Sequence, residues 1–580
     1  MKTILSRVKF NKKQMVVMIV FAVIASLAQM VAPMLVSKML DGVSGNNKTT
    51  IIILAVVMIV LSVLACVTNI VSTNIAAKLT TRFSADLRRE VFYKVQSFSA
   101  VELDKFGAAS LITRNTTDVT MIQSFMILLF RLGLLAPLMA VMGLIFGVAS
   151  SGALAVVIAI AIPILITFVA VILILASRYS VKLRDKIDAI NKRFLETLEG
   201  VRVIRAFNKQ ADELRRFDEV NEETTEVSRR SITISGMMTP VVTSLFGLTS
   251  VGAMLVGSYQ VMQDSLDVSA LVSATQYINI ILIAITLLAT VVSVFPDAYA
   301  CMHRISAVLE TEASICDPKK EMPKKTCHGT VEFRSVTFSY PGADAPVFKE
   351  LSFVSRPGEI TAIIGRTGCG KSSVVKLIPR LYDTSYGEVL VDGVNVKRYK
   401  LNELRDLVGY VPQKNVLFSG DIGENLNFGN EKGSEAEWKE AAHIACADEF
   451  VEHKEGTYHA PVSQGGTNFS GGQRQRLAIA RAVMKKAEVY IFDDSFSALD
   501  MKTDKQLRQK LKESMGDATM IVVAQRVSTI MDATRIIVLE DGEVVGMGTH
   551  RELLTSCRLY REIAEIQLGK KEVEHELESL

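Results

Sequence analysis

The chain has 580 residues, of which 49% are hydrophobic, and its mean hydropathy is +0.29. This length allows several domains, and the apolar content is high for a wholly soluble protein. The formal net charge of +4 is small and gives no basis for nucleic-acid binding. The seven cysteines are dispersed without CxxC pairs, which favours reduced thiols over a disulfide framework or a metal site.

Six apolar stretches in the first half of the chain are long enough to cross a bilayer, for which a helix needs about 20 residues. Basic residues precede the first stretch, and the connections near 72–126 and 177–240 are rich in Lys and Arg. The connections near 149–153 and 261–270 have neither, so we expect both termini in the cytosol and the protein in the cell (plasma) membrane. The stretches lie near Met15–Leu35, Ile51–Val71, Ile127–Val148, Leu154–Ala176, Val241–Gln260 and Leu271–Val294.

A rival interpretation makes residues 1–30 a cleavable signal peptide, because ASLAQ loosely resembles a cleavage site. The apolar stretch runs past Ala28 to Val36, and the later spans need an inside start, so we favour a membrane span. The two long inner connections are helix-patterned and charged throughout, and structureless loops of that length are improbable. We therefore expect them to extend the membrane helices into the cytosol, each pair joined by a short turn.

Arg131 is a charged residue within a predicted span. An intramembrane charge is a functional-site candidate by default. This one lies near the inner end of its span, so its side chain could instead reach the headgroups or contact another helix. Both interpretations stay open.

From about Gly329 the pattern changes to short β-rich runs broken by turns. The run ITAIIG leads directly into GRTGCGKSS and then a helical stretch, which is the context that a phosphate-binding GxxxxGK[ST] loop requires. Its glycines let the backbone wrap phosphates, Lys371 should reach the β- and γ-phosphates, and Ser372 should ligate Mg²⁺. The predicted ATP-binding residues of the loop are Gly365, Arg366, Thr367, Gly368, Cys369, Gly370, Lys371, Ser372 and Ser373.

The run VYIFDD reads as a buried strand that ends in Asp493, which suits a carboxylate linked to Mg²⁺ at a nucleotide site. This run follows the string NFSGGQRQRLAIARA (Asn468–Ala482), and the pair resembles the ATP-binding cassette (ABC) transporter family. The family signature is LSGGQ, in which Phe469 replaces the usual Leu here. The resemblance implies that Tyr340 stacks on adenine, that Gln413 senses Mg²⁺ and that Asp500 is the D-loop aspartate; the implied metal ligands are Ser372, Gln413 and Asp493.

The membrane half also resembles this family. Phe106–Val119 and Leu198–Gln210 look like the cytosolic loops of ABC exporters, whose short coupling helices rest on the nucleotide-binding domains. The implied fold is an α-helical membrane domain of six transmembrane helices with long cytosolic extensions, plus an α/β P-loop NTPase domain of the ABC type. The expected parts are a membrane domain at 1–310, a linker at 311–328, a nucleotide-binding domain at 329–568 and a charged tail at 569–580 that ends as a solvated helix.

The signature residues predict a dimer. Ser470, Gly471, Gly472 and Gln473 form a small-residue turn at a helix start that can approach a γ-phosphate through backbone N–H groups. In the resembled fold this turn completes the ATP site of the partner, so that two ATP molecules are held between two domains. Release after hydrolysis lets the domains part, and the coupling helices transmit that motion.

Two positions closest to the chemistry depart from the family. Asp494 stands where a hydrolysing relative has Glu to orient water, and Gln525 stands where the family has the switch His. The shorter Asp and the amide predict a site that holds ATP and cuts it slowly, while the intact signature can serve a partner. We therefore expect a subunit of a heterodimeric exporter of amphipathic small molecules, of the kind found in bacterial multidrug pairs.

Two other functions remain open from the sequence. One is a homodimeric ABC exporter of lipid or peptide, because Asp for Glu is tolerated in some homodimers. The other is a regulatory or channel-like membrane protein gated by a nucleotide that it seldom hydrolyses. The expected ligands are ATP, Mg²⁺, membrane lipid and a small amphipathic substrate, without nucleic acid.

Overall fold

The computed structural model describes residues 11–150, 152–263, 265–318 and 327–578. They form two compact units. Unit 1 runs to Gln96 and resumes from Ala108 to Thr311, and unit 2 comprises Ser97–Gly107 and the chain from Glu312 onward. Residues 97–107, which the sequence prediction placed in the membrane domain, therefore belong to unit 2.

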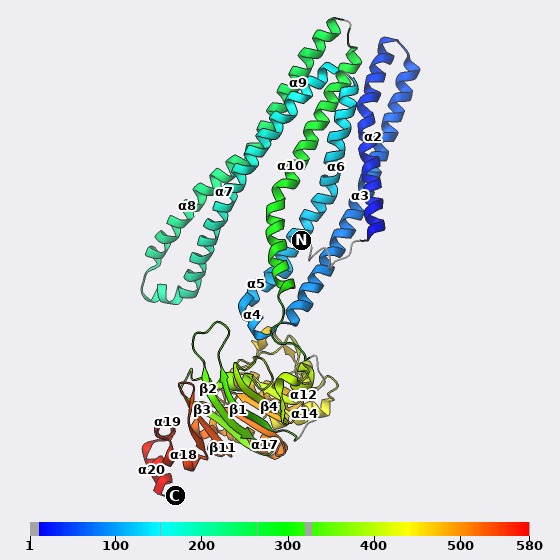
Figure 1. Cartoon of the computed structure of the whole chain (residues 1–580). Coiled ribbons are helices and arrows are strands. Elements are labelled where there is room, and N and C mark those ends of the chain that lie inside the picture. The colour runs from blue at the N-terminus through cyan, green and yellow to red at the C-terminus, as the bar shows by residue number, and fades with distance from the viewer. Residues whose placement is uncertain (1–10, 151, 264, 319–326, 579–580) are drawn as a thin grey trace. The chain divides into compact units, whose positions relative to one another are not determined.

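Unit 1 is built mainly of long helices (Figure 1), and among its described residues six helices are long and apolar enough to cross a membrane. The predicted six spans with long helical extensions are confirmed. The α7 and α8 helices run side by side, as do α2 and α3. The described helices of unit 1 are α2 (Lys12–Ser44), α3 (Lys48–Gln96), α5 (Ala108–Thr113), the π-helix η1 (Arg114–Asp118), α6 (Val119–Ser150), α7 (Gly152–Ala206), α8 (Gln210–Gly236), α9 (Met238–Met262) and α10 (Val268–Glu310).

Small residues allow the helices of unit 1 to approach closely, as expected where the lipid offers no hydrophobic drive for association. A Cβ at Gly257 of α9 would lie 2.1 Å from Leu271 Cδ1 of α10. Hydrogen bonds add specificity between helices: the hydroxyl of Tyr277 on α10 donates to the Met30 carbonyl of α2 at 3.0 Å. Tyr277 and Met30 are both buried.

Unit 2 contains two main sheets. In the six-stranded sheet every neighbouring pair is parallel except the edge pair β12–β11. Its order is β12 (Glu543–Gly548), β11 (Arg535–Glu540), β3 (Ile360–Gly365), β10 (Thr519–Val523), β9 (Val489–Asp493) and β6 (Val408–Val411). The antiparallel sheet has the order β2 (Phe348–Ser355), β1 (Val331–Phe338), β4 (Tyr386–Val391) and β5 (Val394–Asn395), and β7 (Gly420–Asp421) pairs with β8 (Pro461–Val462).

Helices cover the parallel sheet because its strands are apolar on both faces. All five residues of β9 and of β10 are buried. The helices of unit 2 are α4 (Ala100–Phe106), α11 (Lys371–Lys376), α12 (Leu401–Asp406), α13 (Ile422–Asn427), α14 (Glu435–Ile444), α15 (Asp448–Val451), α16 (Gly471–Val483), α17 (Met501–Ser514), α18 (His550–Ser556), α19 (Arg558–Leu568) and α20 (Lys570–Glu578), with short 3₁₀ turns η2 (Val396–Arg398), η3 (Thr457–His459), η4 (Gln464–Gly466) and η5 (Val527–Thr529).

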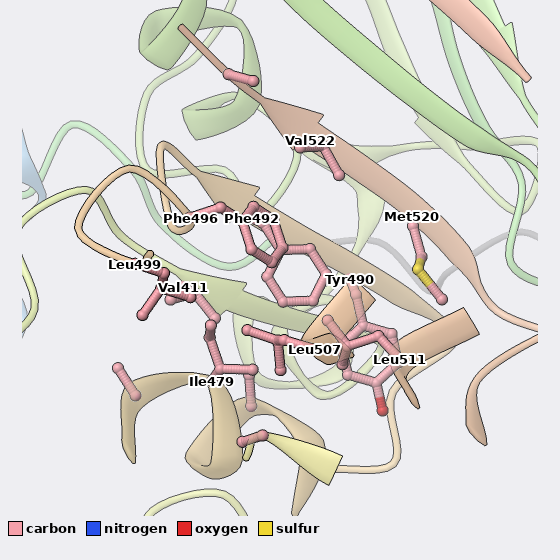
Figure 2. Close-up of a cluster of buried hydrophobic side chains, with 14 of the residues drawn as sticks. Val411, Ile479, Tyr490, Phe492, Phe496, Leu499, Leu507, Leu511, Met520 and Val522 are labelled. Atoms are coloured by element: carbon pink, nitrogen blue, oxygen red, sulfur yellow. The ribbon is translucent and has the colours of Figure 1, made fainter. Parts of the chain in front are cut away.

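One hydrophobic core joins β9 and β10 to the helices on one side of the sheet (Figure 2). Tyr490 and Phe492 of β9 pack there with Ile479 of α16 and Leu507 of α17. Phe492 immediately precedes Asp493, so this packing fixes the strand end that carries Asp493 and leads into Asp494.

The C-terminal segment differs from the sequence prediction. The solvated helix end that was predicted for 569–580 is wrong for Val573, which is 1% exposed in α20. His550 Nε2 also lies 2.9 Å from Glu576 Oε2, and His550 itself is buried. The charged composition hid a narrow apolar side of the helix that packs on α18 and α19.

Candidate active site

The predicted nucleotide-site residues converge at one edge of the parallel sheet. The phosphate-binding loop follows β3, Gln525 follows β10, Asp494 follows β9 and Gln413 follows β6. These four strands are consecutive neighbours in the sheet. The carboxyl ends of parallel strands share an edge, where ligands bind in open α/β sheets.

The phosphate-binding loop closes around its own lysine. Lys371 Nζ donates to the carbonyls of Gly365 and Arg366, each at 2.8 Å. Gly370 has φ +94°, and a Cβ there would lie 2.6 Å from Val347 Cγ1, so this position requires glycine. Arg366, Thr367 and Gly368 are exposed at the tip of the loop, whereas Cys369 and Ser373 are buried.

Asp493 is fixed beside the loop. Ser372 Oγ donates to Asp493 Oδ1 at 2.7 Å, and the Tyr410 hydroxyl donates to Oδ2 at 3.4 Å. Asp493 is 1% exposed, and this burial raises the pKa of its carboxyl. The hydrogen bonds from Ser372 and Tyr410 lower the pKa, but the effect of burial is larger. A carboxylate and a hydroxyl at this distance are the hard oxygen donors that Mg²⁺ prefers.

Asp494 is held by amide groups. Its Oδ2 accepts hydrogen bonds from Gln525 Nε2 at 2.7 Å and from Gln413 Nε2 at 3.4 Å. Burial raises the pKa of this carboxyl, the Gln413 bond lowers it, and the Asp493 charge raises it further. The three residues that sequence analysis assigned to water activation and metal sensing therefore meet around one carboxylate oxygen.

The backbone of Asp494 is equally constrained. Its φ is +51°, a left-handed conformation that Asp tolerates better than most residues. Its carbonyl accepts from Gln475 Nε2 at 3.2 Å and from Ser497 Oγ at 3.0 Å. Gln475 belongs to α16, so the helix that begins at the signature turn contacts the backbone of Asp494.

Tyr340 lies next to the loop. Its hydroxyl is 2.8 Å from Ser373 Oγ. Its ring makes edge contacts with Phe338 and Tyr382, at centroid distances of 4.9 and 5.2 Å. These contacts orient the aromatic ring.

The signature turn is the beginning of α16. Ser470 is its N-cap and forms a reciprocal capping box with Gln473. A Cβ at Gly471 would meet nothing within 4 Å, so a ligand has access to the turn. Asp500 is the N-cap of α17, because its Oδ2 accepts from the Thr503 N–H at 3.0 Å, and hydrogen bonding to Thr503 lowers the pKa of its carboxyl.

Sequence reasoning missed one contact that spans 42 residues. Gln567 of α19 donates from Nε2 to the Gln525 carbonyl at 2.8 Å. Its Oε1 accepts from the Val527 N–H at 2.7 Å. This side chain thus holds the segment that carries Gln525, although no local motif marks it. The contacts of Tyr410, Gln475 and Ser497 with Asp493 and Asp494 were also missed.

Comparisons with known proteins agree with this geometry. The family model for the ABC transporter transmembrane region matches residues 15–285, and the ABC transporter model matches residues 348–497. An ABC transporter ATP-binding protein of Mycobacterium tuberculosis (strain CDC 1551 / Oshkosh) is 36% identical over 96% of both chains. The ABC transporter ATP-binding protein YfiB of Bacillus subtilis (strain 168) is 34% identical over 94% of both chains.

More distant relatives and a solved structure agree with this fold. The ATP-dependent lipid A-core flippase of Escherichia coli (strain K12) is 27% identical over 91% of both chains. The structure of a bacterial Atm1-family ABC exporter with ATP bound superposes with a TM-score of 0.80 at 22% identity, covering 95% of this chain and 97% of that one. The chain therefore belongs to the ABC transporter family, as an ATP-driven exporter half-transporter in which a six-helix membrane domain is fused to an ABC nucleotide-binding domain.

Proposed function

We propose that this chain is one subunit of a heterodimeric exporter of amphipathic small molecules, and that its own ATP site hydrolyses slowly. The proposal rests mainly on the hydrogen-bonded pair of Asp494 and Gln525. A carboxylate that must orient water stands on a short side chain, and an amide occupies one of its oxygens at 2.7 Å.

The length of Asp494 limits its reach toward the attacking water. Asp is shorter than Glu by one C–C bond, about 1.5 Å. A misplacement of about 1 Å can lower a rate on the order of 10²-fold. The two hydrogen bonds to the Asp494 carbonyl hold its backbone in the left-handed conformation, which opposes a forward shift that would compensate for the shorter side chain.

Gln525 cannot replace the chemistry of a switch histidine. An amide donates and accepts hydrogen bonds but does not titrate near neutral pH. In this site Gln525 donates to Asp494 rather than leaving it free for water. Both departures act on the same carboxylate, so their effects on hydrolysis reinforce each other.

ATP and Mg²⁺ binding should survive these departures. Lys371 and the loop glycines would hold the phosphates, and Tyr340 would stack on adenine. Ser372, Asp493 and Gln413 would provide the Mg²⁺ ligands, directly or through water. The metal would neutralise the phosphate charge, and the protein groups would hold the nucleotide in place.

The intact signature supports a role in a second site. The capped turn at Ser470–Gln473 is open at Gly471 and presents a helix start toward an anion. A partner that contributes its own phosphate loop, a Glu and a His would complete an active site with this turn. We place the complex in the cell membrane with both termini of this chain in the cytosol.

A homodimeric lipid exporter is the second candidate. Relatives named ATP-dependent lipid A-core flippase are 29% and 27% identical to this chain. This alternative requires two copies of the Asp494 site to hydrolyse ATP fast enough for transport. A nucleotide-gated regulatory protein requires neither site to hydrolyse, and would pass solute downhill with a non-hydrolysable ATP analogue.

The test is the composition of the native complex. The chain should be affinity-tagged in its own cells, extracted in mild detergent and analysed by native mass spectrometry. We expect a one-to-one complex with a second half-transporter that carries Glu and His at the matching positions. A complex of two identical copies that hydrolyses ATP rapidly would refute the proposal.

A further inference from the structure

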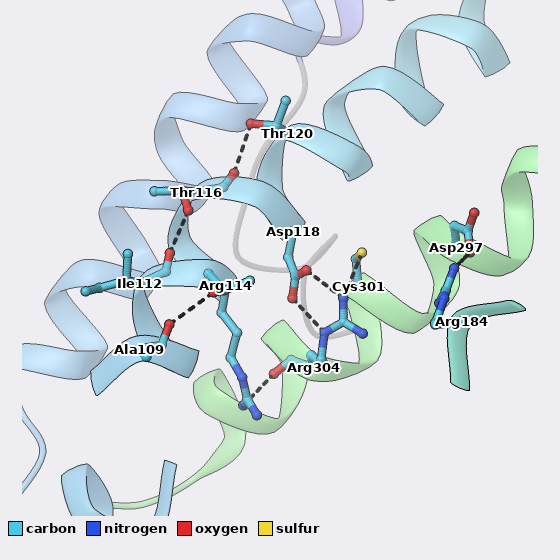
Figure 3. Close-up of polar contacts among 11 residues, drawn as sticks. Ala109, Ile112, Arg114, Thr116, Asp118, Thr120, Arg184, Asp297, Cys301 and Arg304 are labelled. Carbon is cyan, nitrogen blue, oxygen red and sulfur yellow. Dashed lines mark hydrogen bonds and ion pairs between the residues drawn. The ribbon is translucent and has the colours of Figure 1, made fainter. Parts of the chain in front are cut away.

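A two-point ion pair joins η1 to α10 inside unit 1 (Figure 3). Arg304 donates from Nε to Asp118 Oδ2 at 2.8 Å and from Nη2 to Oδ1 at 2.6 Å. The Asp118 side chain is 3% exposed. A bidentate contact to a buried carboxylate fixes both distance and orientation, unlike a single contact between surface charges.

A second arginine strengthens the same junction. Arg114, at the beginning of η1, donates from Nη1 to the Arg304 carbonyl at 3.1 Å (Figure 3). Arg304 Nη2 also lies 3.2 Å from Cys301 Sγ, one turn earlier on α10. The η1 segment thus holds α10 through both a side chain and a backbone carbonyl.

The π-helical form of η1 is itself unusual. Single π turns inside α-helices occur frequently at functional sites. The hydroxyl of Thr116 donates to the Ile112 carbonyl at 2.8 Å, and that of Thr120 donates to the Thr116 carbonyl at 2.9 Å. These bonds to carbonyls four residues back stabilise the wide turn that carries Asp118.

The pair lies close to two places where the chain passes between the units. The chain enters unit 2 after Gln96, returns after Gly107 and leaves again after Thr311. Asp118 follows the second passage by roughly three helical turns, and Arg304 precedes the third by roughly two.

The same two passages are also bonded to each other within unit 2. The Ser314 N–H donates to Glu102 Oε1 of α4 at 3.1 Å, and the Ser314 and Ser99 hydroxyls are 2.9 Å apart. Glu102 is 5% exposed. Each unit therefore holds its ends of the α4–α5 and α10 connections together.

We propose that Asp118 and Arg304 are positioning residues that make these two connections move as one, so that nucleotide binding in unit 2 displaces the membrane helices of unit 1. The covalent connections are one route along which movement in one unit reaches the other. Without the ion pair, η1 can shift along α10, and the displacement is lost between the two helices before it reaches the spans.

The experiment measures hydrogen–deuterium exchange of the purified transporter in lipid nanodiscs, with and without Mg²⁺ and the non-hydrolysable analogue AMP-PNP. Peptides from residues 360–376 report nucleotide binding, and peptides from residues 268–280 report the response of α10 in unit 1. The variants are Asp118→Asn and Arg304→Lys. The matched control is Asp297→Asn, because Asp297 also lies on α10 and pairs with Arg184 at 2.6 Å, but both side chains are exposed (Figure 3).

We expect both variants to keep the response at 360–376 and to lose that at 268–280, by on the order of tenfold in the nucleotide-induced change of exchange rate. Asp297→Asn should keep both responses. Arg304→Lys retains the positive charge but not the two-point contact, so this variant still tests the proposal if Asp118→Asn does not fold. A wild-type response at 268–280 in the folded Arg304→Lys variant would overturn the proposal, as would an equal loss in Asp297→Asn.

Discussion

Restoring the expected catalytic groups should accelerate hydrolysis at this chain's own site. The double variant Asp494→Glu with Gln525→His lengthens the carboxylate by about 1.5 Å and removes the amide that donates to its oxygen at 2.7 Å. Because a 1 Å misplacement corresponds to about 10²-fold in rate, or roughly 2.7 kcal/mol, we expect an increase on the order of 100-fold.

The assay is phosphate release by the full-length chain, purified without other transporter subunits and reconstituted in nanodiscs. All ATP sites in this preparation carry the same residues, so the rate belongs to one kind of site. Lys371→Ala in the double variant should return the rate to background, which excludes a contaminating ATPase. A double variant that binds MgATP with unchanged affinity and hydrolyses it within about twofold of the wild-type rate would show that Asp494 and Gln525 do not limit hydrolysis.

Three further predictions concern the nucleotide site and the hydrogen bonds of Glu102 in α4. Ser470→Ala and Ser434→Ala each remove an N-cap, so each should lower the free energy of unfolding by about 1 kcal/mol. Only Ser470→Ala should also lower ATP hydrolysis by the assembled transporter. Equal hydrolysis rates in two variants whose stabilities are equal by calorimetry would contradict the role of the signature turn. Tyr340→Ala should weaken binding of a fluorescent ATP analogue on the order of tenfold or more. Tyr340→Phe keeps the ring and should bind the analogue with wild-type affinity. Loss of binding in both variants would assign the effect to the hydroxyl group, which lies beside Ser373. Burial opposes ionisation of Glu102, but the hydrogen bonds from Ser99 and Ser314 outweigh burial and lower the pKa of its carboxyl. The stabilising contribution of Glu102 is therefore present above pH 4.5 and is lost as the pH falls through the lowered pKa. Thermal unfolding should show Glu102→Gln less stable than wild type at neutral pH and equally stable in acid, whereas a difference that does not change with pH would contradict this assignment.

Much of the architecture follows from local patterns. Apolar stretches near 20 residues predict membrane helices because the bilayer sets their length. The phosphate loop is predicted because a strand, a glycine-rich turn and a helix occur consecutively. Asp494, Gln525 and Gln413 were expected at one site, and the order of the parallel strands explains why they meet at one carboxylate.

The remaining features depend on contacts between distant parts of the chain. Asp118 and Arg304 are 186 residues apart, and neither lies in a pattern that reveals its partner. Residues 97–107 were assigned by their position between two spans, although their contacts place them in unit 2. In α20 the charged composition concealed a single buried side chain, Val573, which a composition argument cannot detect.

If water is activated mainly at the site of a partner subunit, a complex that contains only copies of this chain should turn over ATP slowly. ATP hydrolysis should be measured in proteoliposomes for this preparation and for the native complex. We predict near-background turnover from the copies alone, unchanged by Asp494→Asn, and rapid turnover from the native complex. Rapid hydrolysis by the copies alone, abolished by Asp494→Asn, would contradict the account.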